Sequence, residues 1–266
     1  MPINLRLYYE IAIRAFRRAS VYRAAYVAGI LTNAFFAALR CFVYLAVYHA
    51  GTSVAGFSPN DAITYTWLTQ ALISIGAGWL AWDLMQTIRS GDVITDLSRP
   101  WSFYGYWLSR SLGERCFNLL LRGSVTYLIG FLFFAARLPH LTEALAFVVA
   151  IGLALLVSFA YGFIVNLTAF WLIDNTGVML IANIVLTFFS GFLLPLAFFP
   201  PWLRQVALLL PFQAITSLPA EIWLGHLTGA AVWRAFAVQA GWALVLMLLA
   251  IRMLHFAMRK VVIQGG

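Results

Sequence analysis

Charged residues are scarce in this sequence: Asp, Glu, Lys and Arg together make up 10% of its 266 residues. A soluble domain averages about 25%. Hydrophobic residues make up 63% of the chain, and several apolar runs reach the roughly 20 residues that a helix needs to cross a bilayer. The shortage of charge excludes an ordinary soluble domain. We therefore expect an all-α polytopic membrane protein that forms one transmembrane domain over residues 1–266.

Lysine is almost absent as well, and the motifs of common enzymes are missing. The one lysine, Lys260, follows Arg259, whereas a Walker A loop needs a lysine directly after glycine to hold the phosphates of ATP. The sequence also has no G-x-S-x-G and no H-E-x-x-H motif, which mark two large hydrolase classes. We expect no enzyme activity and no cofactor in this chain. If ATP drives it, ATP and Mg²⁺ bind to a separate subunit.

Cysteine and histidine are also few. Cys41 and Cys116 lie in or beside apolar runs and form no C-x-x-C pair. The histidines, at positions 49, 140, 226 and 255, are scattered without the spacing of metal ligands. The sequence therefore predicts neither a disulfide framework nor a metal site.

Six apolar runs are long enough to predict membrane-spanning helices. They cover residues 24–48, 62–82, 116–136, 145–172, 178–198 and 231–251. Twelve basic residues flank one side of the predicted membrane, and three (Arg137, Arg204 and Arg234) flank the other. Because basic residues concentrate on the cytoplasmic side, we expect both termini in the cytoplasm. The net charge of +8 fits this rule and an attraction to anionic lipid, so we expect no nucleic-acid partner.

Two flanking segments have patterns of their own. Residues 1–22 place apolar side chains on one helical face and arginines on the other, which predicts a helix in the headgroup plane. A solvated helix packed on a partner remains the alternative. Residues 194–229 hold five prolines yet stay apolar. Because each piece between prolines is too short to span, this segment predicts an external re-entrant or interfacial helical hairpin.

A polar segment, residues 83–115, separates the second and third apolar runs. Asp92 sits where a short helix would begin, near its positive end, and Arg99-Pro100 would terminate it, because a residue before proline avoids helical geometry. Val93, Ile94 and Leu97 are expected on one face. A second helix, over residues 101–115, is expected to skim the inner interface before the third span. The charge count places this segment in the cytoplasm.

The stretch "IRSGDVITDLSRPWSFYGYWLSRSL" resembles a pattern of ABC-2 type (type V) exporter permeases: Gly, an acidic residue, two apolar positions and a Leu-x-Arg-Pro ending. The chain is most similar to the branch of bacterial permeases related to drug and viologen exporters. The resemblance implies a multi-pass protein of the bacterial inner membrane, a cytosolic ABC ATPase partner, and a second permease chain in a homodimer or a paralogous heterodimer. It implies that residues 1–22 form the elbow helix and residues 194–229 the external re-entrant helices.

The resemblance also implies roles for individual residues. The coupling helix that docks on the ATPase comprises Gly91, Asp92, Val93, Ile94, Asp96 and Leu97, with Arg99 beside it. A solvated loop with a helix cap is the alternative for this segment. Asp174 and Asn175 correspond to a second cytoplasmic contact, or form a plain turn.

Polar and aromatic residues inside the predicted spans are candidates for a translocation pathway. Arg40 lies deep in the first span, where a charge is costly and usually faces a cavity or a partner; a structural pair is its alternative. Arg122 is near enough to the inner end to snorkel. Further candidates are Phe35, Phe36, Tyr65, Trp67 and Asn166. The aromatic rings could instead face lipid, and Asn166 could form an interhelical hydrogen bond.

Three functions compete at this point. An exporter permease accounts for the polar cytoplasmic segment at residues 83–115. A secondary transporter or channel without an ATPase usually shows inverted repeats with matched broken helices, and no such repeat is evident. An intramembrane enzyme or assembly factor lacks a catalytic constellation here. We expect an exporter of a hydrophobic or amphipathic substrate such as a drug or a lipid.

Overall fold

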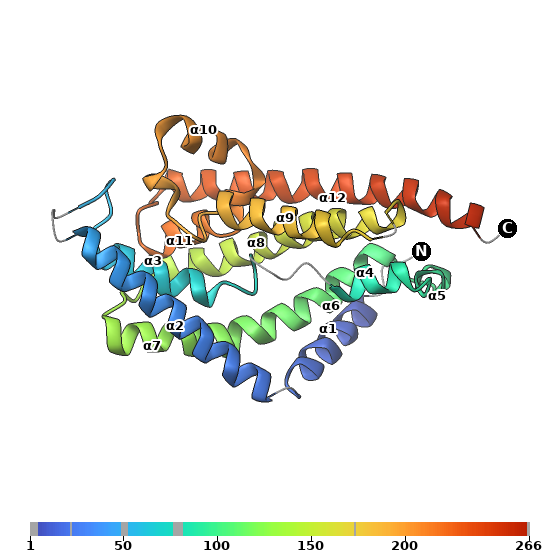
Figure 1. Ribbon diagram of the computed structural model, residues 1–266, viewed down its shortest axis with the longest axis horizontal. Coiled ribbons are helices and arrows are strands. Elements are labelled where there is room, and N and C mark those ends of the chain that lie inside the picture. The colour runs from blue at the N-terminus through green and yellow to red at the C-terminus, as the bar shows by residue number, and fades with distance from the viewer. Residues whose placement is uncertain (1–4, 22, 49–52, 77–81, 173, 265–266) are drawn as a thin grey trace.

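The computed structural model describes residues 5–21, 23–48, 53–76, 82–172 and 174–264, without the side chains of 23, 25 and 260–264. Helices account for 81% of the described residues. The described residues contain no strand beyond one isolated bridge between Val54 and Phe57. The all-α prediction is confirmed. The helices form an elongated bundle and mostly run along its long axis (Figure 1).

Four helices in the described part of the chain are long and apolar enough to cross a membrane: Tyr26–Tyr48, Phe103–Phe134, Leu141–Phe170 and Ala230–Arg259. They belong to α2 (Arg23–Tyr48), to α6 (Phe103–Phe117) with α7 (Ser124–Phe134), to α8 (Leu141–Leu167) and to α12 (Ala230–Gln264). They match four of the six predicted spans. A π-helical turn, Asn118–Gly123, joins α6 to α7 without a break. The helix expected over residues 101–115 is present as α6, and it continues into the third predicted span.

The second and fifth predicted spans are not long continuous helices. Helix α3 (Pro59–Ala71) has 13 residues and ends in a turn at residues 72–76. Helix α9 (Thr176–Phe189) has 14 residues and ends where Gly191 adopts a φ of +83°, a backbone conformation that favours glycine. At 1.5 Å per residue each covers only about 20 Å, less than the hydrocarbon core. Helix length alone thus supports four crossings, not six.

Helix α8 lies at the centre of the bundle. Within its most apolar stretch 61% of the residues are buried, against 22% for α2 and α12. The outer faces of α2 and α12 carry exposed apolar side chains, among them Phe42 and Leu248. Soluble monomers rarely expose apolar patches of this extent, so these faces fit a multi-pass membrane protein.

The segments between the long helices gather at two ends (Figure 1). At the α5 end lie α4 (Trp82–Arg89), α5 (Val93–Ser98) and the end of α12. At the α10 end lie α10 (Pro201–Leu209), α11 (Ser217–Trp223) and the start of α3. The predicted polar segment and the predicted proline-rich hairpin therefore occupy opposite ends of the bundle.

Helix α1 (Leu5–Ala19) packs along α6. Two glycines make this close approach possible. A Cβ at Gly113 would lie 2.0 Å from the Ala12 carbonyl oxygen, and one at Gly105 would lie 2.9 Å from the Tyr8 ring. The Tyr8 hydroxyl accepts a hydrogen bond from the Ser102 backbone N–H at 3.0 Å. The predicted amphipathic helix is present, with its apolar face against the bundle.

Candidate partner-docking site

Helix α5 is a short projection whose ends follow from its sequence. Gly91 adopts a φ of +82°, and a Cβ there would meet nothing within 4 Å, so backbone geometry rather than crowding favours glycine at this turn. The Ser90 hydroxyl donates a hydrogen bond to an Asp92 carboxylate oxygen at 2.7 Å. Arg99, which precedes proline, is extended with ψ 151° and ends the helix. The predicted short helix is thus present.

One side of α5 is anchored in an apolar core and the other is free. Val93 is 3% exposed and Leu97 packs partly against the same cluster, which includes Met85, Phe103 and Leu254. Ile94 is 56% exposed. The prediction that Val93, Ile94 and Leu97 share one face is therefore wrong for Ile94: consecutive helical residues lie about 100° apart, and the core contacts only the side of Val93 and Leu97.

Charged groups surround this helix. Asp92 and Arg99 are exposed. Partial burial raises the pKa of the Asp96 carboxyl, and the nearby Arg99 and Arg110 oppose that rise. The Arg99 guanidinium lies 5.0 Å from the centre of the Trp101 ring, a cation–π distance.

The second predicted contact lies next to α4. Arg89 forms an ion pair with Asp174 at 3.8 Å, and both side chains are largely exposed. The Thr176 backbone N–H donates to the Asp174 carboxylate at 2.8 Å. Hydrogen bonds from the Thr176 side chain and backbone lower the pKa of Asp174. Asn175 is fully buried, and its side chain donates to the Thr168 hydroxyl. Of the two predicted contact residues, only Asp174 has a side chain that a partner can reach.

Arg40 has acceptors that its sequence context does not reveal. Its guanidinium donates to the backbone carbonyls of Phe192 at 2.7 Å and Leu193 at 3.0 Å. The Tyr44 hydroxyl donates to the same Leu193 carbonyl at 3.2 Å. Together they fasten α2 to the turn that follows α9, where backbone carbonyls lack helical partners. The structural alternative for Arg40 accounts for these contacts.

The other pathway candidates do not converge on one cavity. Tyr65 and Trp67 are fully buried, and the Tyr65 hydroxyl donates to the Gly191 carbonyl at 2.7 Å. Asn166 is fully buried and donates within its own helix, to the Gly162 carbonyl. Phe35 and Phe36 lie exposed on the outer face of α2. These positions fit packing and lipid contact, and they offer a substrate no common surface in this structure.

Two arginines link helices inside the bundle. Arg122 donates to the Gly29 carbonyl at 3.1 Å and to the Asn33 side chain at 2.9 Å, both in α2. The sequence counted Arg115 only as a flanking charge, yet its side chain is buried, with 6% exposed. It donates to the Ser158 hydroxyl at 2.8 Å and to the Ile75 carbonyl at 3.4 Å. Arg115 thereby donates a hydrogen bond to the turn that interrupts the second predicted span. This contact joins residues far apart in the chain, so no local sequence pattern predicts it.

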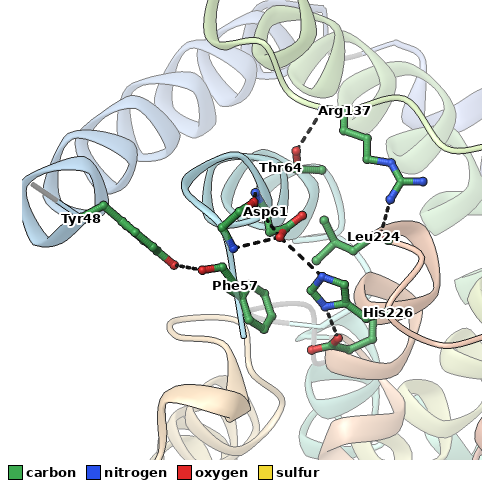
Figure 2. A network of polar contacts seen from close by, with 9 residues as sticks. Tyr48, Phe57, Asp61, Thr64, Arg137, Leu224 and His226 are labelled. Atoms are coloured by element: carbon green, nitrogen blue, oxygen red, sulfur yellow. Dashed lines mark hydrogen bonds and ion pairs between the residues drawn. The ribbon is translucent and has the colours of Figure 1, made fainter. Parts of the chain in front are cut away.

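Sequence analysis also missed a polar network at the α10 end (Figure 2). His226 lies between two acids, with ring nitrogens 2.8 Å from the Glu221 carboxylate and 3.6 Å from that of Asp61. The hydrogen bond to Glu221 is the main cause that raises the pKa of His226. Asp61 also completes a capping box with Ser58 at the start of α3. His226 thus ties the start of α3 to α11.

A second part of the network surrounds Arg137, in the loop before α8. Its side chain pairs with Glu143 and donates to the Leu224 carbonyl. Its backbone N–H donates to the Thr64 hydroxyl at 2.9 Å, as Figure 2 shows. Three elements, α3, α8 and α11, therefore meet at one arginine. In the sequence analysis Arg137 was used only in the count of basic residues that predicts membrane orientation.

The family model for ABC-2 family transporter proteins matches residues 34–265. The chain belongs to the ABC-2 family of transporters. The match includes α5, α10 and α11 and leaves out α1, so the family assignment does not depend on the amphipathic helix. No curated protein and no solved structure matches the chain. ABC-2 permeases are membrane transport components that generally work with a cytosolic ATPase.

Proposed function

We propose that this ABC-2 protein is the permease subunit of an ATP-binding cassette exporter. It moves a hydrophobic or amphipathic substrate out of the cytoplasm or the inner leaflet, and a separate ATPase subunit that docks at α5 supplies the energy. The observation that carries the proposal is the form of α5: Val93 is held in the core, while Ile94 is 56% exposed beside the exposed Asp92. A helix anchored on one side can transmit a push that it receives on the other.

Several features support this assignment of the energy source. The chain has no Walker A loop, since its one lysine follows Arg259, so ATP and Mg²⁺ belong to the partner. Asp174, joined to Arg89 of α4, adds a second exposed carboxylate near α5. Docking would therefore involve Asp92, Ile94, Arg99 and Asp174, while Gly91, Val93 and Leu97 shape and anchor the helix.

The topology in this proposal keeps six crossings, both termini in the cytoplasm and a bacterial inner-membrane location. The α5 and α10 segments lie at opposite ends (Figure 1), which supports an outer position for α10 and α11 if α5 is cytoplasmic. The α3–α4 segment and the α9 segment would then supply the second and fifth crossings as interrupted helices. A second permease chain, identical or paralogous, would complete the transporter, as the family resemblance implies.

Copurification tests the docking. Wild-type protein is expected to copurify with an ATPase that carries a Walker A motif and to support ATP-dependent export. Ile94→Asp is expected to lower the copurified ATPase on the order of tenfold, because it places a charge in an apolar contact. Asp92→Arg should act in the same direction by reversing a charge.

Leu138→Asp is the matched control. Leu138 is 54% exposed and lies in the loop before α8, at the α10 end, so the same chemical change should leave the ATPase bound. Melting temperatures in detergent check that each variant folds. The proposal fails if the wild-type protein brings down no ATPase, or if folded Ile94→Asp protein keeps its full ATPase content and export activity.

A further inference from the structure

A groove with a volume of about 650 Å³ lies between α1 and the start of α6. Its charged lining is almost entirely basic. The lining includes Arg6, Arg14 and Arg18 from α1, Arg99 and Arg110 from the α5–α6 segment, and one acid, Glu10. Five guanidinium groups thus face a single carboxylate across one concave surface.

Most of this positive charge is not neutralised within the described part of the chain. Arg110 pairs with Asp83, and the Asp96 carboxyl lies near Arg99 and Arg110. Arg6, Arg14 and Arg18 form no ion pair with a described residue. Arginines from two different elements repel one another at close range unless an anion lies between them. The groove therefore favours a negatively charged ligand over an empty state.

Aromatic rings fix the guanidinium groups on the α6 side. Trp101 and Tyr106 stack with ring centres 4.9 Å apart. Arg99 lies 5.0 Å from the Trp101 ring centre. A guanidinium held over a ring keeps its N–H groups free to donate, and arginine suits phosphate because its donors match pairs of oxygens.

The length of the helix beside the groove supports a position at the depth of the membrane headgroups. Phe103–Phe134 is a continuous 32-residue helix, about 48 Å long against a hydrocarbon core of about 30 Å. Three of its four charged residues, at 110, 114 and 115, lie in the first half, and the fourth, Arg122, is hydrogen-bonded to α2, so the first turns are the part expected to extend beyond the hydrocarbon. Aromatic and basic residues are typical of that depth. The groove also carries apolar lining, Leu7, Ile11 and Ala15.

We propose that this groove binds the headgroup of an anionic phospholipid. The phosphate would accept hydrogen bonds from arginines of both walls, and Leu7, Ile11 and Ala15 would contact the glycerol and the first acyl carbons. The apolar lining and the headgroup depth favour a lipid over free phosphate. The bound headgroup would hold α1 against the α5–α6 segment and neutralise the repulsion between them. This inference requires only that the chain lies in a membrane, and it is independent of ATPase docking.

Lipid titration of the purified full chain in neutral detergent tests the site. The probes are phosphatidylglycerol, phosphatidylcholine with the same acyl chains, and inorganic phosphate. Native mass spectrometry measures lipid affinity and thermal unfolding measures stabilisation. The wild-type protein should bind phosphatidylglycerol more tightly and melt higher with it than with the other two probes. Arg14→Gln/Arg18→Gln should lower phosphatidylglycerol affinity on the order of tenfold or more and abolish the lipid-dependent rise in melting temperature.

The control variant is Arg17→Gln/Arg252→Gln. It removes the same charge from two exposed arginines that do not line the groove, and glutamine is nearly as good a helix former as arginine. This variant should behave like the wild type. Four results would overturn the proposal: equal affinity for both lipids, full stabilisation by inorganic phosphate, an equal loss in the control, or unchanged lipid affinity with loss of the ATPase in the groove variant. The last result would assign the groove to an acidic segment of the partner.

Discussion

At the α10 end, Asp61, Glu221 and His226 join α3 to α11 through half-buried contacts, whereas at the α5 end the pair Arg89–Asp174 lies on exposed surface. The first end is fastened by a network that spans several elements. The second end presents a short helix held mainly by Val93. At the α10 end a polar network joins several elements, whereas at the α5 end an apolar anchor holds α5, Arg110 pairs with Asp83, and Asp92 and Arg99 remain exposed.

Val93→Asp should have the largest effect and should show that the anchor of α5 is apolar. Val93 is 3% exposed, and an unpaired charge buried at such a site costs about 3 kcal/mol. Unfolding in detergent measures the loss of stability. Ile94→Asp is the adjacent control, since Ile94 is 56% exposed, and it should leave the stability nearly unchanged. Equal losses in the two variants would contradict the one-sided anchoring of α5.

Arg137→Gln should break the network at the α10 end. It removes the partner of Glu143 and the donor to the Leu224 carbonyl, and the remaining half-buried carboxylate makes the change costly. We expect a loss of about 2 kcal/mol in the free energy of unfolding, from the same unfolding measurement. Arg204→Gln, an exposed arginine on α10, should cost almost nothing. A loss of comparable size in both variants would argue against the network.

His226 should make the stability of the α10 end depend on pH. The folded protein raises the pKa of His226 above its ordinary value of 6.5, so its contribution is fully present below that value and is lost as the pH rises through the raised pKa. Asp61 and Glu221 face the ring, and the Arg137–Glu143 pair lies beside Gly225.

The measurement for His226 is the difference in melting temperature between the wild type and His226→Gln as a function of pH. The wild type should be the more stable protein at low pH, by less than about 1 kcal/mol, and the difference should shrink with rising pH. A difference that grows with pH would contradict the assigned sign.

Arg89→Gln should have the smallest effect. Its ion pair with Asp174 is exposed and 3.8 Å long, and such pairs contribute between zero and about 0.5 kcal/mol. We expect no measurable change in unfolding, compared with the wild type at the same ionic strength. A loss as large as that of Arg137→Gln would remove the distinction between the two ends.

Local signals predicted the limits of α5 well, because glycine geometry and the Arg99-Pro100 step act over a few residues. They did not predict which side of α5 faces the core. Val93 and Ile94 are equally apolar in the sequence. Only the packing of α4, α6 and α12 decides that Val93 is buried and Ile94 is exposed. The interruptions of the helices in the second and fifth predicted spans were missed for a similar reason. Hydropathy reports composition over a window, whereas the turn at residues 72–76 is served by Arg115 and Ser158, which lie far away in the chain.

The sequence by itself determined the all-α membrane class, four of the long helices and the family resemblance that the match over residues 34–265 supports. These properties depend on composition, on helix length and on short motifs, which act locally. Only the tertiary structure decided the partners of Arg40 and His226, the burial of Asn175 and the basic groove between α1 and α6. Each of these joins elements distant in sequence, and such contacts are set by how whole helices pack.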